Sequence, residues 1–183
     1  MNDVVDLILQ DHEELKRLFD VLQKEPDKRE GLAPVMSTLL FAHSRAEESE
    51  VYPAAGSAGA QDDVEHSQKE HLAADQLAER LAAADPTSSE FENLLSELVE
   101  AVKHHMEEEE EKVLPAMREK MPADQLETLG ERFLSVRKQH LGDQPEDMTR
   151  DQMQQQATNA NVDGTSGLPK DELKERLSQE AET

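Results

Sequence analysis

The chain has 183 residues, enough for one domain with a sizeable core and a smaller appendage. It contains no cysteine, which excludes a disulfide scaffold, thiolate metal ligands and a cysteine nucleophile. Its net charge of -23 repels phosphate backbones and anionic lipids and attracts cations, so we expect neither nucleic acid nor a membrane as a partner.

The chain up to residue 141 is predicted to be helical, because the alternation typical of strands is absent there while Leu, Ala, Glu, Lys and Gln dominate. The first helix covers residues 3–24 and ends before Pro26. The second covers residues 34–52, with Pro34 in its first turn. Residues 54–60 then form a loop rich in Gly, Ala and Ser. Apolar residues and histidines recur at steps of three and four on the inner faces, which are Ile8, His12, Leu15, Phe19 and Leu22, and Met36, Leu39, Leu40, His43, Glu47 and Val51.

The third helix is predicted at residues 62–84 and the fourth at about 87–117, after a cap at Thr87 or Ser88. Their inner faces are Val64, His71, Ala74, Ala78 and Leu81, and Phe91, Leu94, Leu98, Val102, His105, Glu109 and Val113. Four long helices with short connections predict an all-α fold, an antiparallel up-down four-helix bundle. An extra helix at 123–140 packs on its outside or folds back along it, which completes a domain of residues 1–141.

The remaining chain is predicted to be a linker at residues 142–147, which includes Gly142, Asp143 and Pro145, and a small appendage at 148–183. Residues 148–153 and 168–173 form a weak repeat, and each copy has the features of a helix start. We expect a helix–loop–helix unit or a partly disordered tail. The chain has no apolar run of the roughly 18 residues that span a membrane and no export signal, so we expect a cytoplasmic protein.

One pattern occurs twice among the four core helices. His43 precedes Glu47 by four residues, His105 precedes Glu109 by four, and each pair is followed by an apolar residue and a proline. Residues four apart lie about 40° apart on a helix, so each pair presents an imidazole and a carboxylate in the same direction. With His12 and His71 the order is H…HxxxE…H…HxxxE, a set able to hold two metal ions.

Two other pairs have the same spacing but lie off the apolar stripes. His104 and Glu108 are rotated about 100° from the inner stripe of their helix, and His66 and Glu70 lack the following proline. We therefore place both pairs on the surface. The same register leaves four glutamates in solvent: Glu107, Glu108, Glu110 and Glu111.

A buried helix face normally excludes carboxylates, because an unpaired buried charge is very costly. Four inward histidines with two carboxylates therefore indicate a metal site. Imidazole and carboxylate without thiolate suit iron, manganese or zinc, and two shared carboxylates suit a bridged dinuclear centre.

The chain resembles hemerythrin-like, or HHE cation-binding, domains over roughly residues 3–141. The resemblance depends on the segments 11–15, 43–48, 69–72 and 105–109, which contain the six residues above. It implies a four-helix bundle with two iron ions in an oxo- or hydroxo-bridged centre. By analogy, His12 and His43 serve one iron, His71 and His105 serve the other, and Glu47 and Glu109 bridge them.

The chain departs from oxygen-carrying hemerythrins at Asp75, where these proteins have a fifth histidine. Four histidines leave more coordination positions open, which favours reaction with peroxide, oxygen or nitric oxide over simple oxygen carriage. Peroxide decomposition is the favoured activity, and an iron or oxygen sensor without turnover is the alternative. Tyr52 is either an additional ligand or neighbour of the metal, or a packing residue at the helix end.

The tail, over residues 147–178, resembles the helix–loop–helix units of the Rho termination factor N-terminal-like family. Acids outnumber bases there, so we do not transfer nucleic-acid binding. We expect this appendage to stabilise the bundle or dock a protein partner.

Overall fold

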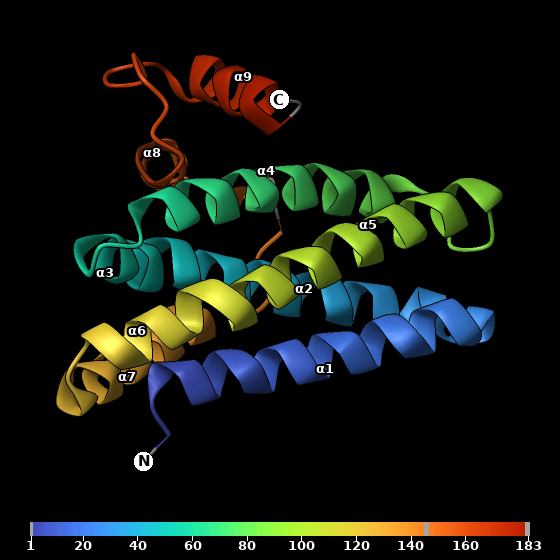
Figure 1. Ribbon diagram of the computed structural model, residues 1–183. Coiled ribbons are helices and arrows are strands. Elements are labelled where there is room, and N and C mark those ends of the chain that lie inside the picture. The colour runs from blue at the N-terminus through green and yellow to red at the C-terminus, as the bar shows by residue number, and fades with distance from the viewer. Residues whose placement is uncertain (1, 145–146, 182–183) are drawn as a thin grey trace.

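The computed structural model describes residues 2–144 and 147–181, and in these ranges every regular element is helical (Figure 1). Four long helices form the body: α1 (Val4–Lys24), α2 (Arg29–Ala46), α4 (Gln61–Ala83) and α5 (Ser89–Glu108). The contacting pairs are α1 with α2, α2 with α4, α4 with α5, and α5 with α1. Because short connections join successive helices, this ring is the predicted up-down bundle.

The helix starts follow from local capping. The Asp3 carboxylate accepts the backbone N–H of Asp6 at 2.9 Å, and the Ser88 hydroxyl accepts that of Phe91 at 3.1 Å. The predicted start at Pro34 is wrong: α2 begins at Arg29, directly after the short helix η1 (Pro26–Lys28). The buried Arg29 side chain donates to the carbonyl of Leu22 and ties this turn to α1, while Pro34 is exposed and is tolerated within the helix.

Neither proline that follows the repeated pattern ends its helix. For Pro53 this overturns the predicted helix end at residue 52, whereas the helix predicted at about 87–117 already passes Pro115. Each proline is preceded by a π-helical turn, η2 (Glu47–Val51) or η3 (Glu109–Val113), and the helix then continues as α3 (Tyr52–Ser57) or α6 (Leu114–Lys120). A proline lacks an N–H and its ring crowds the preceding turn, so a widened turn accommodates it without a break. The predicted loop at 54–60 is therefore helical as far as Ser57.

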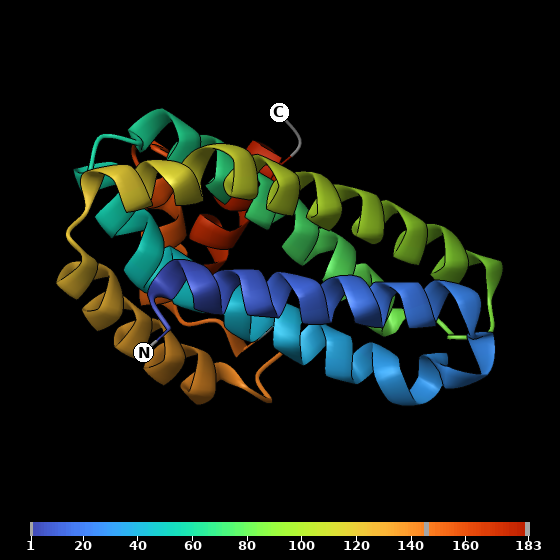
Figure 2. The ribbon, with the colours of Figure 1, turned by 60° about the horizontal axis from the view of Figure 1, so that its bottom comes forward.

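Helix α7 (Ala123–His140) folds back against α1 and α2 (Figure 2). It approaches closely at Gly130, where an added Cβ would lie 3.1 Å from the backbone nitrogen of Val4.

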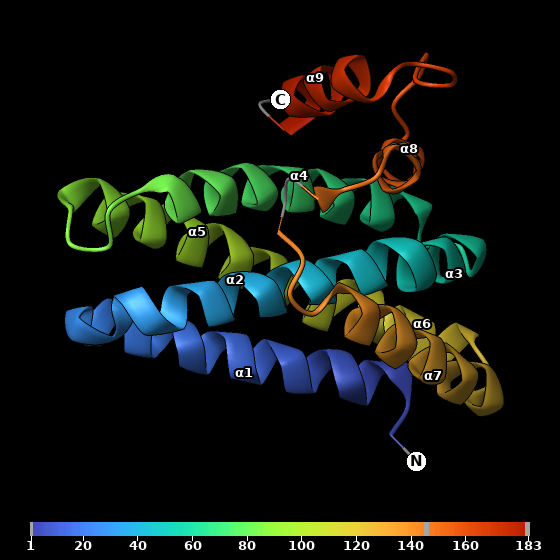
Figure 3. The ribbon, with the colours of Figure 1, turned by 180° about the vertical axis from the view of Figure 1, so that it is seen from behind.

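The tail contains α8 (Arg150–Asn159) and α9 (Lys170–Ala181), which lie over α4 (Figure 3). A capping box between Thr149 and Gln152 begins α8. Pro145, a residue of the predicted linker, lies outside the described residues. No helix in the described ranges is long and apolar enough to cross a bilayer.

Two apolar clusters fill the bundle, one at each end. Leu15, Met36, Ala78 and Leu98 belong to one, while Ile8, Val51, Val64 and Val113 belong to the other. The predicted histidines sit between the two clusters along every core helix. The apolar packing therefore encloses a polar layer near the middle of the bundle.

Candidate metal centre

The structure brings the six predicted residues together in that layer. His12, His43, His71 and His105 come from α1, α2, α4 and α5 respectively, and Glu47 and Glu109 are the first residues of the two π-turns. All six are buried. The bundle thus brings four imidazoles and two carboxylates, from six elements, close together.

Each glutamate lies between two histidines. Glu47 Oε2 is 3.2 Å from His43 Nε2 and 3.4 Å from His71 Nε2. Glu109 Oε2 is 3.6 Å from His12 Nε2 and 3.5 Å from His105 Nε2. The ligand atoms form two groups that share Glu47: His12, His43 and Glu47, and Glu47, His71 and His105.

Several of these atoms have no hydrogen-bond partner among the described residues although they are buried. They are His12 Nε2, His43 Nε2, both oxygens of Glu47 and Oε2 of Glu109. Buried polar atoms are almost always satisfied, and a buried carboxylate needs a positive partner. Metal ions placed between these atoms would satisfy them, so the residues present fit a metal centre.

The other ring nitrogen of each histidine faces a carboxylate, which fixes the ring with Nε2 pointing inward. The four pairs are His12 Nδ1 with Glu110 at 2.9 Å, His43 Nδ1 with Asp11 at 3.2 Å, His71 Nδ1 with Glu48 at 3.2 Å, and His105 Nδ1 with Glu70 at 2.9 Å. Outer carboxylates of this kind orient metal-binding imidazoles and raise their basicity.

Sequence reasoning missed these four carboxylates. Glu110 was expected in solvent, but it reaches His12 and also accepts from Lys16 at 3.0 Å. Glu70 was placed on the surface with His66, but one of its oxygens binds His105. In the sequence, these residues lie beside the apolar stripes, as surface residues do. Their role becomes visible only when the helix that carries the contacted histidine is in place.

Helix α7 covers one side of the centre. The Phe133 ring meets the His43 ring edge-on at 5.8 Å between centroids. The Arg137 guanidinium donates to both oxygens of Asp11, at 2.6 and 2.8 Å, and thereby holds the carboxylate that faces His43. Burial opposes ionisation of Asp11, but bonds to His43 and Arg137 outweigh it and lower its pKa.

The tail reaches the other side through Glu48. The side-chain amide of Gln156 donates to Glu48 Oε1 at 3.1 Å, and that of Asn159 donates to the Glu48 backbone carbonyl at 2.9 Å. Arg45 and Gln68 also donate to Glu48 Oε1. Helix α8 therefore helps to hold the carboxylate that orients His71.

Tyr52 lies within the centre. Its hydroxyl donates to Glu109 Oε1 at 3.0 Å and is 3.1 Å from His71 Nε2. Burial, followed by the nearby charges of Glu109 and Glu47, raises the pKa of Tyr52 well above its usual value. The phenol is therefore neutral near pH 7 and acts as a hydrogen-bond donor there.

The charges of the centre are balanced by protons when no cation is bound. Burial alone lowers the pKa of His43, but the charge of Glu47 and the bond to Asp11 outweigh it and raise the pKa to about 10. Bonds to Glu47 and Glu48 likewise overcome burial and raise the pKa of His71 to about 10. These protonated imidazoles lower the pKa of Glu47 well below its usual value despite its burial.

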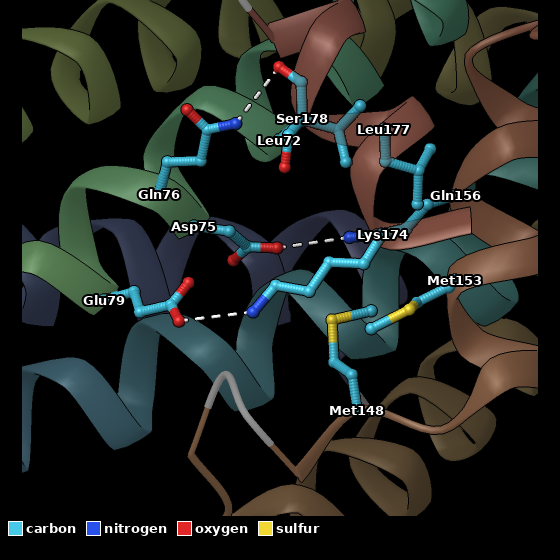
Figure 4. A pocket seen from close by; sticks show the side chains of 10 residues that line it. All are labelled: Leu72, Asp75, Gln76, Glu79, Met148, Met153, Gln156, Lys174, Leu177 and Ser178. Atoms are coloured by element: carbon cyan, nitrogen blue, oxygen red, sulfur yellow. Dashed lines mark hydrogen bonds and ion pairs between the residues drawn. The ribbon is translucent and has the colours of Figure 1, made fainter. Parts of the chain in front are cut away.

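Asp75 points away from the centre, toward the tail. Its carboxylate accepts from Arg45 at 2.7 Å and from Gln156 at 3.1 Å, and it lines a cavity of about 60 Å³ between α4, α8 and α9 (Figure 4). The position where oxygen carriers have a fifth histidine thus contributes no group to the metal layer.

A smaller cavity of about 10 Å³ touches the centre itself. His43, His71 and His105 line it together with Leu40, Ala74, Val102 and Met106. This volume is close to that of one water-sized molecule. The space beside the histidines is therefore small and mostly apolar.

Residues 3–117 match the family described as the hemerythrin HHE cation binding domain. The chain belongs to this family. The HHE match includes all six central residues and ends before α7 and the tail, so the Rho-like resemblance of the tail stays a prediction. Membership implies cation binding, in agreement with the two His/Glu groups.

A curated relative of this HHE protein is a DNA nickase from Nostoc sp. (strain PCC 7120), which is 28% identical over 147 residues. The match covers 78% of this chain but only 42% of the nickase, so the chain spans less than half of that protein. No solved structure gives a significant match.

The contact between the tail and Glu48 predicts a measurable contribution to stability. Replacing Asn159 by Ala removes the donor to the Glu48 carbonyl and to Gln68 Oε1, and should lower the free energy of unfolding by about 1–3 kcal/mol. Thr158→Ala, on the exposed side of the same helix, is the control and should change it by less than about 0.5 kcal/mol. Equal effects of the two substitutions in urea unfolding would contradict the role of Asn159.

Proposed function

We propose that this chain is a non-haem di-iron protein that binds or reacts with small oxidants, and that its activity is decomposition of hydrogen peroxide. His12 and His43 would hold one iron, His71 and His105 the other, and Glu47 and Glu109 would bridge them. The observation that carries the proposal is the buried set of Nε2 and carboxylate atoms, five of which have no hydrogen-bond partner among the described residues, beside a cavity of about 10 Å³. When bound, the iron pair supplies the redox chemistry that peroxide, oxygen or nitric oxide requires.

The chain's own residues account for selectivity and proton supply. Leu40, Ala74 and Val102 limit the cavity to very small ligands and exclude bulk water. The Tyr52 hydroxyl oxygen lies 3.0 Å from Glu109 Oε1 and donates its proton to it, so this neutral phenol supplies a proton donor within the centre. The outer carboxylates keep each imidazole oriented, because each accepts from Nδ1.

The alternative is a sensor of iron or oxygen without turnover. One observation favours it: α8 contacts Glu48, which contacts His71, so a change at the centre has a direct route to the tail. Iron-dependent protection of α8 from amide hydrogen exchange, together with negligible peroxide turnover, would favour sensing over catalysis.

The nickase relative suggests a third activity, but the net charge of -23 opposes DNA binding. The test is whether the iron-loaded protein nicks supercoiled plasmid. Nicking that is lost in Glu47→Gln would assign that activity to the present chain.

Iron binding should release protons. Since His43 and His71 have pKa values of about 10, both are protonated at pH 7.5 and both must become neutral to bind a metal. Anaerobic calorimetric titration of the metal-free protein with ferrous iron should therefore release about two protons per chain. The apparent affinity should also rise with pH from 7 toward 10. A binding enthalpy independent of the buffer's ionisation enthalpy would contradict this expectation.

Filling the small cavity should slow peroxide decomposition without removing iron. Ala74→Val adds two carbons at the cavity wall beside the histidines, and should reduce oxygen release from hydrogen peroxide by about tenfold, equivalent to 1.36 kcal/mol of barrier. The matched control is Ala78→Val, one turn away on the same buried face and outside the cavity lining.

Both variants are compared at equal iron content. A rate for Ala74→Val that equals the control's would exclude the cavity as the ligand site. Absence of oxygen release from the iron-loaded wild-type protein would exclude peroxide decomposition itself.

A further inference from the structure

Two His–Glu pairs remain outside the centre, and the fold brings them together. His66 and Glu70 are four residues apart on α4, and His104 and Glu108 are four apart on α5. These helices are neighbours that lie side by side (Figure 1). Pairs that sequence analysis assigned separately to the surface thus form one cluster of two imidazoles and two carboxylates.

The distances within this cluster suit a metal ion. His66 Nε2 is 2.8 Å from Glu108 Oε2 and 3.5 Å from Glu70 Oε1, and His104 Nε2 is 3.7 Å from Glu70 Oε1. An ion with bonds of about 2.1 Å to tetrahedral ligands places neighbouring ligand atoms roughly 3.4 Å apart. The ligand atoms of His66, Glu70 and Glu108 all lie within 4.8 Å of one another. The exposed His104 imidazole contacts this group through Glu70 and would complete the set by turning toward it.

Burial gives the cluster a sheltered base and an accessible rim. The side chains of Glu70 and Glu108 are 15% and 22% exposed, while those of His66 and His104 are 57% and 62% exposed. An ion can therefore enter from solvent between the imidazoles and meet the carboxylates below. The net charge of -23 raises the local concentration of cations.

One carboxylate oxygen of the cluster is buried without a hydrogen bond from any described residue. This is Glu108 Oε2, whose neighbour at 2.8 Å is His66 Nε2, an ion-pair partner when the imidazole is protonated. The other oxygen of Glu108 is bound by Lys112 at 2.6 Å. An ordinary surface ion pair would leave its carboxylate oxygens to water, whereas here Glu108 Oε2 is shielded from solvent beside His66.

Glu70 connects this cluster to the central layer. Its Oε2 accepts from His105 Nδ1 at 2.9 Å, and its Oε1 faces His66 and His104. One carboxylate thus contacts a central histidine with one oxygen and the outer cluster with the other. A cation in the outer cluster would lie one side chain away from the central layer.

We propose that His66, Glu70, His104 and Glu108 form a second, surface site for a divalent first-row transition metal such as Zn²⁺ or Fe²⁺. Two imidazoles and two carboxylates are the ligands these ions accept in the absence of thiolate. The proposal does not require iron in the centre or any turnover. The site gives a cation a place to bind at the surface beside a residue that orients His105.

The test is a zinc titration of three proteins against a chromophoric chelator. The double variant His66→Ala/His104→Ala should bind one Zn²⁺ per chain fewer than the wild type, or bind that ion about tenfold or more weakly. His140→Ala is the matched control, because among the residues that the structure describes His140 pairs with one carboxylate, that of Asp143. It should retain the wild-type stoichiometry.

Comparing the variants with the wild type cancels any zinc bound by the central residues, which all three proteins share. Circular dichroism verifies that the helical fold is intact. Equal zinc stoichiometry and affinity in the double variant and the wild type would overturn the proposal, as would loss of the same ion in His140→Ala.

Discussion

The structure depends on the burial of two carboxylates that no hydrogen-bond donor in the described part of the chain fully satisfies. Glu47 and Glu109 lie in the middle of an otherwise apolar bundle, where an uncompensated charge is strongly destabilising. Only cations offset such a charge, and the six-residue layer offers either protons on the imidazoles or metal ions between them. The apolar clusters on both sides stabilise the bundle around this layer, which tolerates the polar groups because their opposite charges compensate.

The outer carboxylates support the six central residues. The orientation of each imidazole therefore depends on contacts from several parts of the fold. Every Nδ1 atom of the four central histidines has a carboxylate partner. Three of these carboxylates are held in turn by Arg137 from α7, Lys16 from α1 and Gln156 from α8. Helices outside the family match therefore contribute to the geometry inside it. The tail in particular is packed against the bundle through a polar network as well as an apolar cluster.

The fold and the six central residues could be predicted from sequence because the helical period places them on apolar stripes. The outer carboxylates could not, since Glu110 and Glu70 lie beside those stripes and their partners come from distant segments. The π-turns were also missed: the proline after Tyr52 predicts that the second helix stops there, and only the packing of the continuing helix shows that Pro53 is accommodated instead. The pairing of His66 with Glu108 depended on the mutual rotation of α4 and α5, which the sequence does not encode locally.

The di-iron centre is tested most directly by the metal content of the protein purified from iron-supplied cells, measured by inductively coupled plasma mass spectrometry. We expect about two iron ions per chain, with a marked loss in Glu47→Gln and Glu109→Gln and no loss in Glu111→Gln, whose side chain is exposed. A folded protein that binds no iron even after anaerobic reconstitution with ferrous iron would contradict this expectation, as would an iron content that both glutamate substitutions leave unchanged.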